Sequence, residues 1–210
     1  MEYSSLAAAH LSIPVMIQVA LRKKHSEPHR FYHTLTHILH MTKEAISIEE
    51  HISDKLAVLL AILSHDCVYY TDHRYQYNEI ESAEFLRSLI FRISEEFYND
   101  HRDSIEFAVQ LIMMTKDHSI PTGLSINQQS DAALFLDLDL LILSTDSYTY
   151  AQFEKNVRQE FAHVPDEIFN LKRKEVLMHL LDSQIYKSKI FESKIDWAKQ
   201  NLIQAIGNLS

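Results

Sequence analysis

The sequence predicts an all-α protein, and three observations support that prediction. Glycine is nearly absent, with 2 residues among 210, and there are only 4 prolines; the tight turns and bulges of strand-rich folds depend on glycine. Apolar residues recur at helical spacing in segment after segment. Hydrophobic residues make up 46% of the chain and charged residues 23%, a balance that can bury a core. We therefore expect one helical domain over residues 1–210, with a core at about 28–145 and C-terminal helices at about 146–207 packed on it.

The first part of the chain is expected to form five helices. Apolar residues over 35–48 follow the i, i+3, i+4, i+7 pattern of one helix face. The segment 55–66 is apolar almost throughout, which predicts a buried central helix that begins after a Ser53 cap. The expected helices span residues 6–21, 35–48, 55–66, from Asn78 or Ser82 to about 91, and about 104–116.

The second part of the chain follows a predicted loop at Pro121 and Gly123. Residues 131–143 have the apolar character of either a helix or a buried strand, and their length and neighbours favour a helix. Further helices are expected over about 147–161 after an Asp146 or Ser147 cap, over 166–186 after Pro165, and over 196–206.

The charge distribution excludes some partners. The net charge is −9 and no basic run occurs, so we expect no binding to duplex nucleic acid. A phosphorylated small molecule is not excluded, because a bound divalent cation can dominate the local charge. The single cysteine, Cys67, allows no internal disulfide and suits a reducing compartment. The apolar stretch 6–21 is interrupted by polar residues and Pro14, which predicts a domain helix in a cytoplasmic protein without a membrane partner.

Two groups of polar residues interrupt apolar helices in the first part of the chain. His33 and His37 lie four residues apart, hence on one helix face, although two half-exposed histidines would give the same pattern. His65 and Asp66 end the most apolar segment of the chain. Burying an imidazole and a carboxylate together is costly unless they bind each other or a metal. A polar fringe at the end of the helix is the alternative interpretation.

Two further groups lie in the second half of the predicted core. Asp137 and Asp139 stand inside an apolar segment; residues two apart do not share a helix face, so we expect at most one of them to be a metal ligand and the other to be solvated or to support the site. Lys116 and His118 end another helix, where basic residues are common for electrostatic reasons alone.

Histidine and carboxylate ligands from three helices suit a transition metal with open positions for water. The order H…HD…D resembles the HD superfamily of metal-dependent phosphohydrolases, and in detail a bacterial branch of predicted HD-type phosphohydrolases. The resemblance covers about residues 28–205 in colinear order. It rests on the segments RFYHTLTHI (30–38), LSHDCVYY (63–70), NEIESA (78–83), MTKDH (114–118), FLDLDLLIL (135–143), VRQEF (157–161) and VPDEIFNLKRKEVL (164–177).

The resemblance implies an HD-domain-like helical bundle with a metal site at its centre. It assigns four ligands, with Asp139 preferred over Asp137: His37, His65, Asp66 and Asp139. His33 and His118 become candidates for a second metal or for the substrate pocket. One or two divalent ions are expected, among Zn, Mn, Fe, Co, Ni and Mg. The residues after the pair, from Cys67 to Tyr70, depart from the branches that hydrolyse guanosine polyphosphates or cyclic dinucleotides.

The expected activity is hydrolysis of a small phosphoester, such as a nucleotide or related metabolite, by metal-activated water. Asp66 would ligate the metal and could bridge two ions. Arg30, Lys116 and Arg158 are candidates to bind the phosphoryl oxygens, and Glu79 and Glu81 to transfer protons, although each could equally be an ordinary surface charge. The alternatives are an HD-type hydratase or di-iron oxygenase, or a non-catalytic helical module with a structural metal. No feature of the sequence predicts an oligomeric state.

Overall fold

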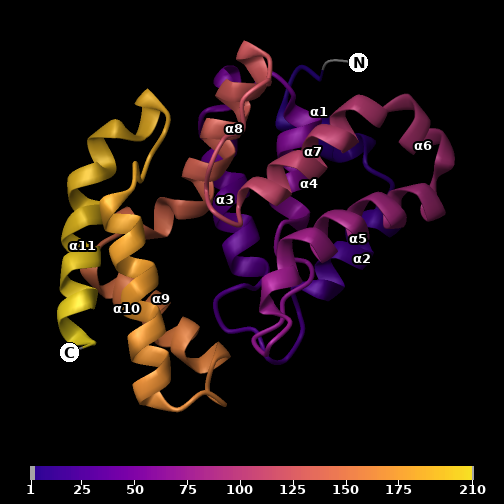
Figure 1. Cartoon of the computed structure of the whole chain (residues 1–210). Helices are drawn as coiled ribbons and strands as arrows, with labels where there is room; N and C mark the ends of the chain where they lie inside the picture. The colour runs from indigo at the N-terminus through magenta and orange to yellow at the C-terminus, as the bar shows by residue number, and fades with distance from the viewer. Residues whose placement is uncertain (1–2, 210) are drawn as a thin grey trace. The chain divides into compact units, whose positions relative to one another are not determined.

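The computed structural model describes residues 3–209, and every regular element in that range is a helix (Figure 1). The all-α prediction is therefore confirmed. The α-helices are α1 (Leu6–Ser12), α2 (Val15–Lys24), α3 (Leu35–Ser47), α4 (Lys55–Ser64), α5 (Asn78–Ile93), α6 (Glu95–Asp100), α7 (Arg102–Met114), α8 (Ile126–Asp139), α9 (Ser147–Glu160), α10 (Asp166–Asp182) and α11 (Ile195–Asn208). Short 3-10 helices are η1 (Glu49–His51), η2 (Tyr75–Tyr77), η3 (Leu140–Ser144) and η4 (Lys189–Lys194). Among these helices, none combines the length and the apolar character that a membrane crossing requires.

The prediction of one helix over 6–21 is wrong, because α1 and α2 are separate. Pro14 stands between them with ψ 133°, outside the helical region. Proline has no N–H to donate, and it disfavours helical backbone in the residue before it; Ile13 is accordingly extended. Helix α6 was not expected either. Ser94 caps it by accepting a hydrogen bond from the Phe97 N–H.

The chain divides into two compact units, residues 1–136 and 137–210. Helix α8 runs continuously to Asp139, so the division falls within its last turn. The predictions of a single domain and of a core at 28–145 stay predictions.

Helix α4 is the centre of the first unit. It packs against α1, α2, α3, α5 and α7, and α5 and α7 lie side by side (Figure 1). A helix that is apolar on all sides is stable only when it is surrounded, and eight of its ten residues are buried. The helix ends at Ser64, two residues earlier than expected. His65 is its C-cap and Asp66 lies in the following turn, so neither belongs to the helix body.

Carboxylates organise the beginning of α4. Asp54 is the N-cap, and its side chain accepts a hydrogen bond from the Ala57 N–H; the predicted Ser53 cap is wrong. The buried Asp131 accepts hydrogen bonds from the backbone N–H groups of Ser53 and Asp54, at 2.8 and 2.7 Å. These two contacts tie the start of α4 to α8 within the first unit.

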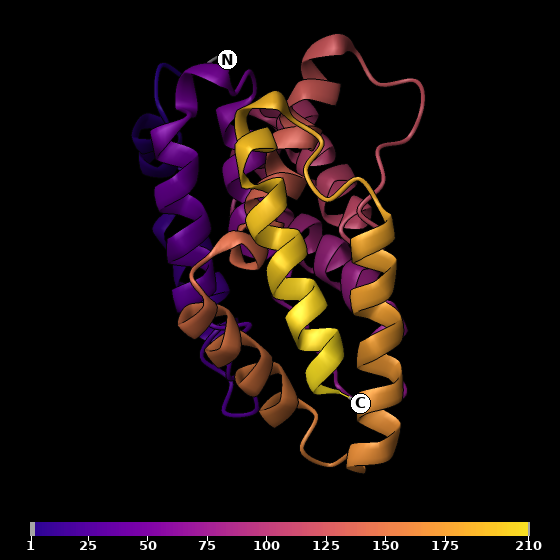
Figure 2. The same cartoon turned by 90° about the vertical axis from the view of Figure 1, so that its left-hand side faces the viewer.

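In the second unit, α11 packs against η3, α9 and α10 (Figure 2). The predicted Asp146 cap is confirmed, since its carboxylate accepts from the N–H groups of Tyr148 and Thr149. Helix α10 ends at Asp182, so the expected extension to 186 is wrong. The buried Tyr186 instead follows the helix, where its hydroxyl donates to the Leu140 carbonyl.

Candidate metal centre

Two buried histidine rings meet at the end of α4. His37 lies in the first turn of α3, which Thr34 caps through its hydroxyl, and His65 is the C-cap of α4. Their Nε2 atoms are 3.3 Å apart, and their side chains are 4% and 1% exposed. The fold thus brings together two histidines that are 28 residues apart in the sequence.

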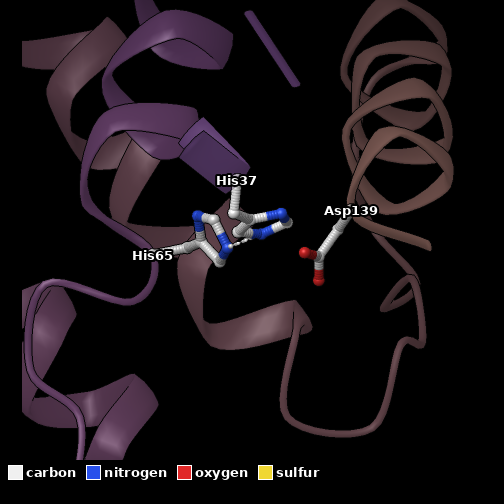
Figure 3. A group of neighbouring side chains, drawn as sticks. All are labelled: His37, His65 and Asp139. Carbon is white, nitrogen blue, oxygen red and sulfur yellow. Dashed lines mark hydrogen bonds between the residues drawn. The ribbon is translucent and has the colours of Figure 1, made fainter. Parts of the chain in front are cut away.

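Two carboxylates join the histidines. One ligand atom from each of His37, His65 and Asp139 lies within 4.8 Å of the other two, so this cluster could hold a metal ion. Figure 3 shows the Asp139 carboxylate directed toward the two rings. The Oδ2 atom of Asp66 lies 2.9 Å from the His65 Nε2 and 3.9 Å from the His37 Nε2. Three of the four residues that the resemblance assigns as ligands therefore form one cluster, and the fourth, Asp66, lies beside its two histidines.

The separation of the two ring nitrogens fits a shared ion. Imidazole nitrogens bind zinc at about 2.0–2.1 Å, so two of them 3.3 Å apart can both reach one ion. The same separation is also that of the hydrogen bond between the two rings.

The hydrogen bond on the far side of the His65 ring determines what its near side presents. The Nδ1 of His65 is 3.2 Å from the Ile62 carbonyl oxygen, which can only accept, so Nδ1 carries the hydrogen. The Nδ1 of His37 is 3.2 Å from the Tyr32 hydroxyl. In the neutral tautomer, the Nε2 of His65 then presents a lone pair to the centre.

Two further groups lie close to that lone pair. The Nε2 of His65 is 2.9 Å from the Asp66 Oδ2 and 3.3 Å from the His37 Nε2, with which it forms a hydrogen bond whose direction depends on the His37 tautomer. A cation at the centre attracts the lone pairs of all these atoms. Nitrogen and oxygen donors in this mixture suit a divalent transition metal. The donor set therefore fits a bound ion.

His33 lies beside the centre. Its ring stacks on the Tyr69 ring with centroids 4.2 Å apart, and its centroid is 6.3 Å from that of His37. A second-metal or substrate role for His33 stays a prediction.

The pKa of Glu79, in the first turn of α5, is influenced by charged groups in the same region. Burial raises the pKa of its carboxyl; Lys116 and His118 act in the opposite direction, and Asp66 adds to the increase. These influences place Lys116 and His118 in electrostatic reach of a carboxyl that also feels Asp66. A role of Lys116 or His118 at the centre itself stays a prediction.

Lys116 and His118 are held in the turn that follows α7. The Lys116 ammonium donates to the Gln76 carbonyl at 3.3 Å and remains exposed. His118 has φ 49°, and it is the only residue other than glycine with positive φ among residues 3–209. Such a conformation costs roughly 1 kcal/mol and is often retained at functional sites.

Glu81 has a different environment. Its carboxylate accepts a hydrogen bond from the Tyr70 hydroxyl at 2.8 Å, and this bond raises the Tyr70 pKa. Arg74 lies over the Tyr70 ring, 4.0 Å from its centroid. A proton-transfer role for Glu81 stays a prediction, and the position of Glu79 fits that role better.

The two candidate arginines are engaged elsewhere. Arg30 has no exposed side-chain surface, and its guanidinium is occupied by Glu27 and by three backbone carbonyls, so the prediction that it binds substrate is wrong. Arg158, in the second unit, donates to Asp166 and to the carbonyls of Phe161 and Val164. These bonds brace the connection between α9 and α10. Substrate binding by Arg158 stays a prediction that they do not support.

One residue in contact with the centre was not found from the sequence, and one that was found has another environment than expected. Tyr32 contacts His37, although it stands in the quoted motif as an ordinary aromatic residue. Asp137 was expected to be solvated or to support the site, but it is buried and accepts from the N–H groups of Lys187 and Ser188 at 2.6 and 2.8 Å.

Residues that closely follow His65 and Asp66 in the sequence line a pocket of about 300 Å³. Residues Val68–Asp72 form one wall, which explains part of the tyrosine cluster at Tyr69 and Tyr70. The other lining residues are Lys24, Glu27, His29 and Arg74.

Comparison of the chain with protein-family models, with curated proteins and with solved structures found no match. The resemblance to the HD superfamily therefore rests on the sequence motifs and the residues that they bring together.

Proposed function

We propose that this chain is a metal-dependent hydrolase of a small phosphoester, of the HD type. The observation that supports the proposal most strongly is the cluster of His37, His65 and Asp139. One ligand atom of each lies within 4.8 Å of the other two, and both histidines are buried. Burying such groups together is costly unless they bind each other or a cation.

The exposure of the ligands indicates the side from which a substrate would approach. The side chains of His37 and His65 are 4% and 1% exposed, whereas that of Asp66 is 20% exposed. Glu79, Lys116 and His118 interact electrostatically in the region of Asp66. We therefore assign the approach of the substrate to the Asp66 side of the centre, where a cationic group and a proton-carrying group act on the same region.

A bound divalent cation supplies two kinds of chemistry, a lower pKa for the water that it binds and polarisation of a phosphoryl oxygen. The residues of the chain do the remaining work. Lys116 offers its ammonium group to the negative oxygens of the substrate. Glu79 has a raised pKa because it is partly buried, so its carboxyl can accept and release a proton closer to neutral pH than a solvated glutamate can. His37 and His65, both buried, would hold the ion.

The substrate is expected to be small. The chain has a net charge of −9 and no basic run, so it has no extended cationic surface to bind a polyanion. Binding of a phosphate group would depend on the ion and on Lys116.

The test is turnover of phosphoesters by protein that has been stripped with chelator and reloaded with a single metal. Nucleotides, sugar phosphates and other small esters would be offered with Mn, Zn, Fe, Co, Ni or Mg in turn. We expect Asp66→Asn to lower kcat by on the order of 1,000-fold, and Lys116→Ala to lower kcat/KM by roughly 10–100-fold. Lys199→Ala removes an exposed lysine from α11 and is the matched control, with no expected effect.

Metal-loaded protein that hydrolyses none of these esters would contradict the proposal. Oxygen consumption by the iron-loaded form would then indicate an oxygenase. Loss of metal from Asp66→Asn together with loss of the fold would indicate a structural metal.

A further inference from the structure

The guanidinium of Arg30 is fully buried next to the metal centre, and its hydrogen bonds form a complete set. Nε and Nη2 donate to Glu27 Oε2 at 3.0 and 2.9 Å. Nη1 donates to the carbonyls of His33 and Asp66 at 3.1 and 2.6 Å, and Nη2 donates to the Cys67 carbonyl at 3.1 Å. These bonds use the five N–H donors of the group.

The three carbonyls belong to two segments that carry metal ligands. The His33 carbonyl directly precedes Thr34, the cap of α3, and His37 lies in the first turn of that helix. The carbonyls of Asp66 and Cys67 belong to the turn after α4, which carries Asp66 itself. Arg30 thus connects the backbone that presents His37 to the backbone that presents Asp66.

Stability alone does not account for a buried arginine in this position. Removing a guanidinium from water costs several kcal/mol, and well-packed apolar residues often stabilise a core as much as a buried ion pair does. The planar fork of arginine can hold several acceptors at fixed angles, which an ammonium group cannot do. The arrangement therefore favours a role in geometry.

Tyr69 packs over this connection. Its ring centroid is 5.4 Å from the Arg30 Cζ, and its ring stacks on His33 at 4.2 Å. An aromatic ring over the guanidinium shields the five hydrogen bonds from water and strengthens them.

We propose that Arg30, held by Glu27, is a positioning residue for the metal centre. It sets the distance between the His37 ring and the Asp66 carboxylate, and through that distance the affinity for the ion. This inference rests on the metal site of the proposed function, and it gives Arg30 no contact with metal or substrate.

The test compares Arg30→Lys with a matched variant, Arg173→Lys. Arg173 also makes a two-bond pair with a glutamate, donating to Glu154 at 3.0 and 2.7 Å, with side chains 13% and 19% exposed. It lies in the second unit and contacts none of the four candidate ligands through this pair. Affinity for Zn²⁺ would be measured by competition with a chromophoric chelator, the visible spectrum of the Co²⁺ form would report ligand geometry, and thermal unfolding in chelator would report stability.

We expect Arg30→Lys to weaken Zn²⁺ binding by 10–100-fold, roughly the effect of losing a residue that orients a ligand, and to alter the Co²⁺ spectrum. Arg173→Lys should lower only the unfolding temperature. A decrease below 10-fold for Arg30→Lys, or an equal decrease for Arg173→Lys, would overturn the positioning role.

If Arg30→Lys does not fold, Glu27→Gln takes its place under the same criterion, because it loosens the guanidinium and leaves it buried. Wild-type protein that binds no metal would overturn the proposed function and this inference together. If the wild type binds metal and the folded Arg30 variant binds it equally tightly, this inference alone is overturned.

Discussion

The two ends of helix α4 both carry buried polar groups, yet they are built in opposite ways. At the beginning, each acceptor meets donors: Asp54 caps the helix, and Asp131 binds the N–H groups of Ser53 and Asp54. At the other end, the His65 Nε2 and the Asp66 carboxylate lie 2.9 Å apart, within reach of the same proton or cation. The first arrangement consists of hydrogen bonds between protein groups, whereas the second brings together groups that can bind a metal ion.

This difference shows that burial of a carboxylate does not by itself indicate a functional site. Asp131 and Asp137 are 1% and 0% exposed, more buried than the candidate ligand carboxylates of Asp66 and Asp139, and each accepts from two backbone N–H groups. Asp66 is more exposed and has the partners that a metal ligand would have. In this chain the partner atoms of a carboxylate, rather than its degree of burial, distinguish a structural role from a metal-binding role.

The largest expected effect is on metal affinity at the C-terminal end. His65→Ala removes the ligand that approaches both His37 and Asp66, so we expect the dissociation constant to rise on the order of 1,000-fold, equivalent to about 4 kcal/mol. Chelator competition would measure it. An affinity within 10-fold of the wild type would show that His65 does not bind the ion.

The N-terminal end should respond in stability instead. Asp131→Ala leaves two backbone N–H groups without their carboxylate, and hydrogen bonds to charged groups contribute about 1.5–3 kcal/mol each. We expect the free energy of unfolding in urea to decrease by about 3 kcal/mol, with metal affinity of the folded protein unchanged. If Asp131→Ala instead lost metal affinity and kept its stability, the N-terminal end of α4 would not have the structural role assigned to it.

A pH effect at the C-terminal end comes next in size. The buried His25 has Nε2 at 2.9 Å from the Leu63 carbonyl, in the last turn of α4, and burial lowers its pKa from 6.5 to about 4. Because the unfolded chain binds the proton more readily, the stability contributed by neutral His25 is fully present above pH 6.5 and is lost as the pH falls toward 4. The loss should reach about 3 kcal/mol.

The comparison variant for this effect is His25→Gln, whose amide can still donate to Leu63 but does not titrate in this range. Urea unfolding of both proteins in chelator between pH 7 and pH 4 would isolate the contribution of His25. Parallel pH profiles would contradict it.

The sequence predicted most helices because their apolar spacing is a local property. It singled out the polar pairs 33/37, 65/66 and 137/139 because polar residues inside apolar segments are conspicuous, and the resemblance to the HD superfamily then favoured residues 37 and 139. It failed at Pro14, where one residue divided a continuous apolar pattern into two helices. Helix ends at Ser64 and Asp182 were also displaced, since they depend on tertiary packing.

The sequence could not show which groups a given polar side chain contacts in the fold. Asp131 and Asp137 look no different from Asp139 in the linear pattern, because their backbone donors lie about 50–78 residues away. Arg30 looked like a surface charge for a substrate phosphate, and only the fold shows that the carbonyls of Asp66 and Cys67 surround it.

The most direct measurement of the central claim is the unfolding free energy of wild type and Asp66→Asn, each in chelator and in excess Zn²⁺. The change removes one negatively charged ligand and keeps the size of the side chain. We expect only the wild type to gain stability from Zn²⁺, because an ion that binds only the folded state raises its free energy of unfolding. A wild type whose free energy of unfolding is the same in chelator and in excess Zn²⁺ would contradict the account.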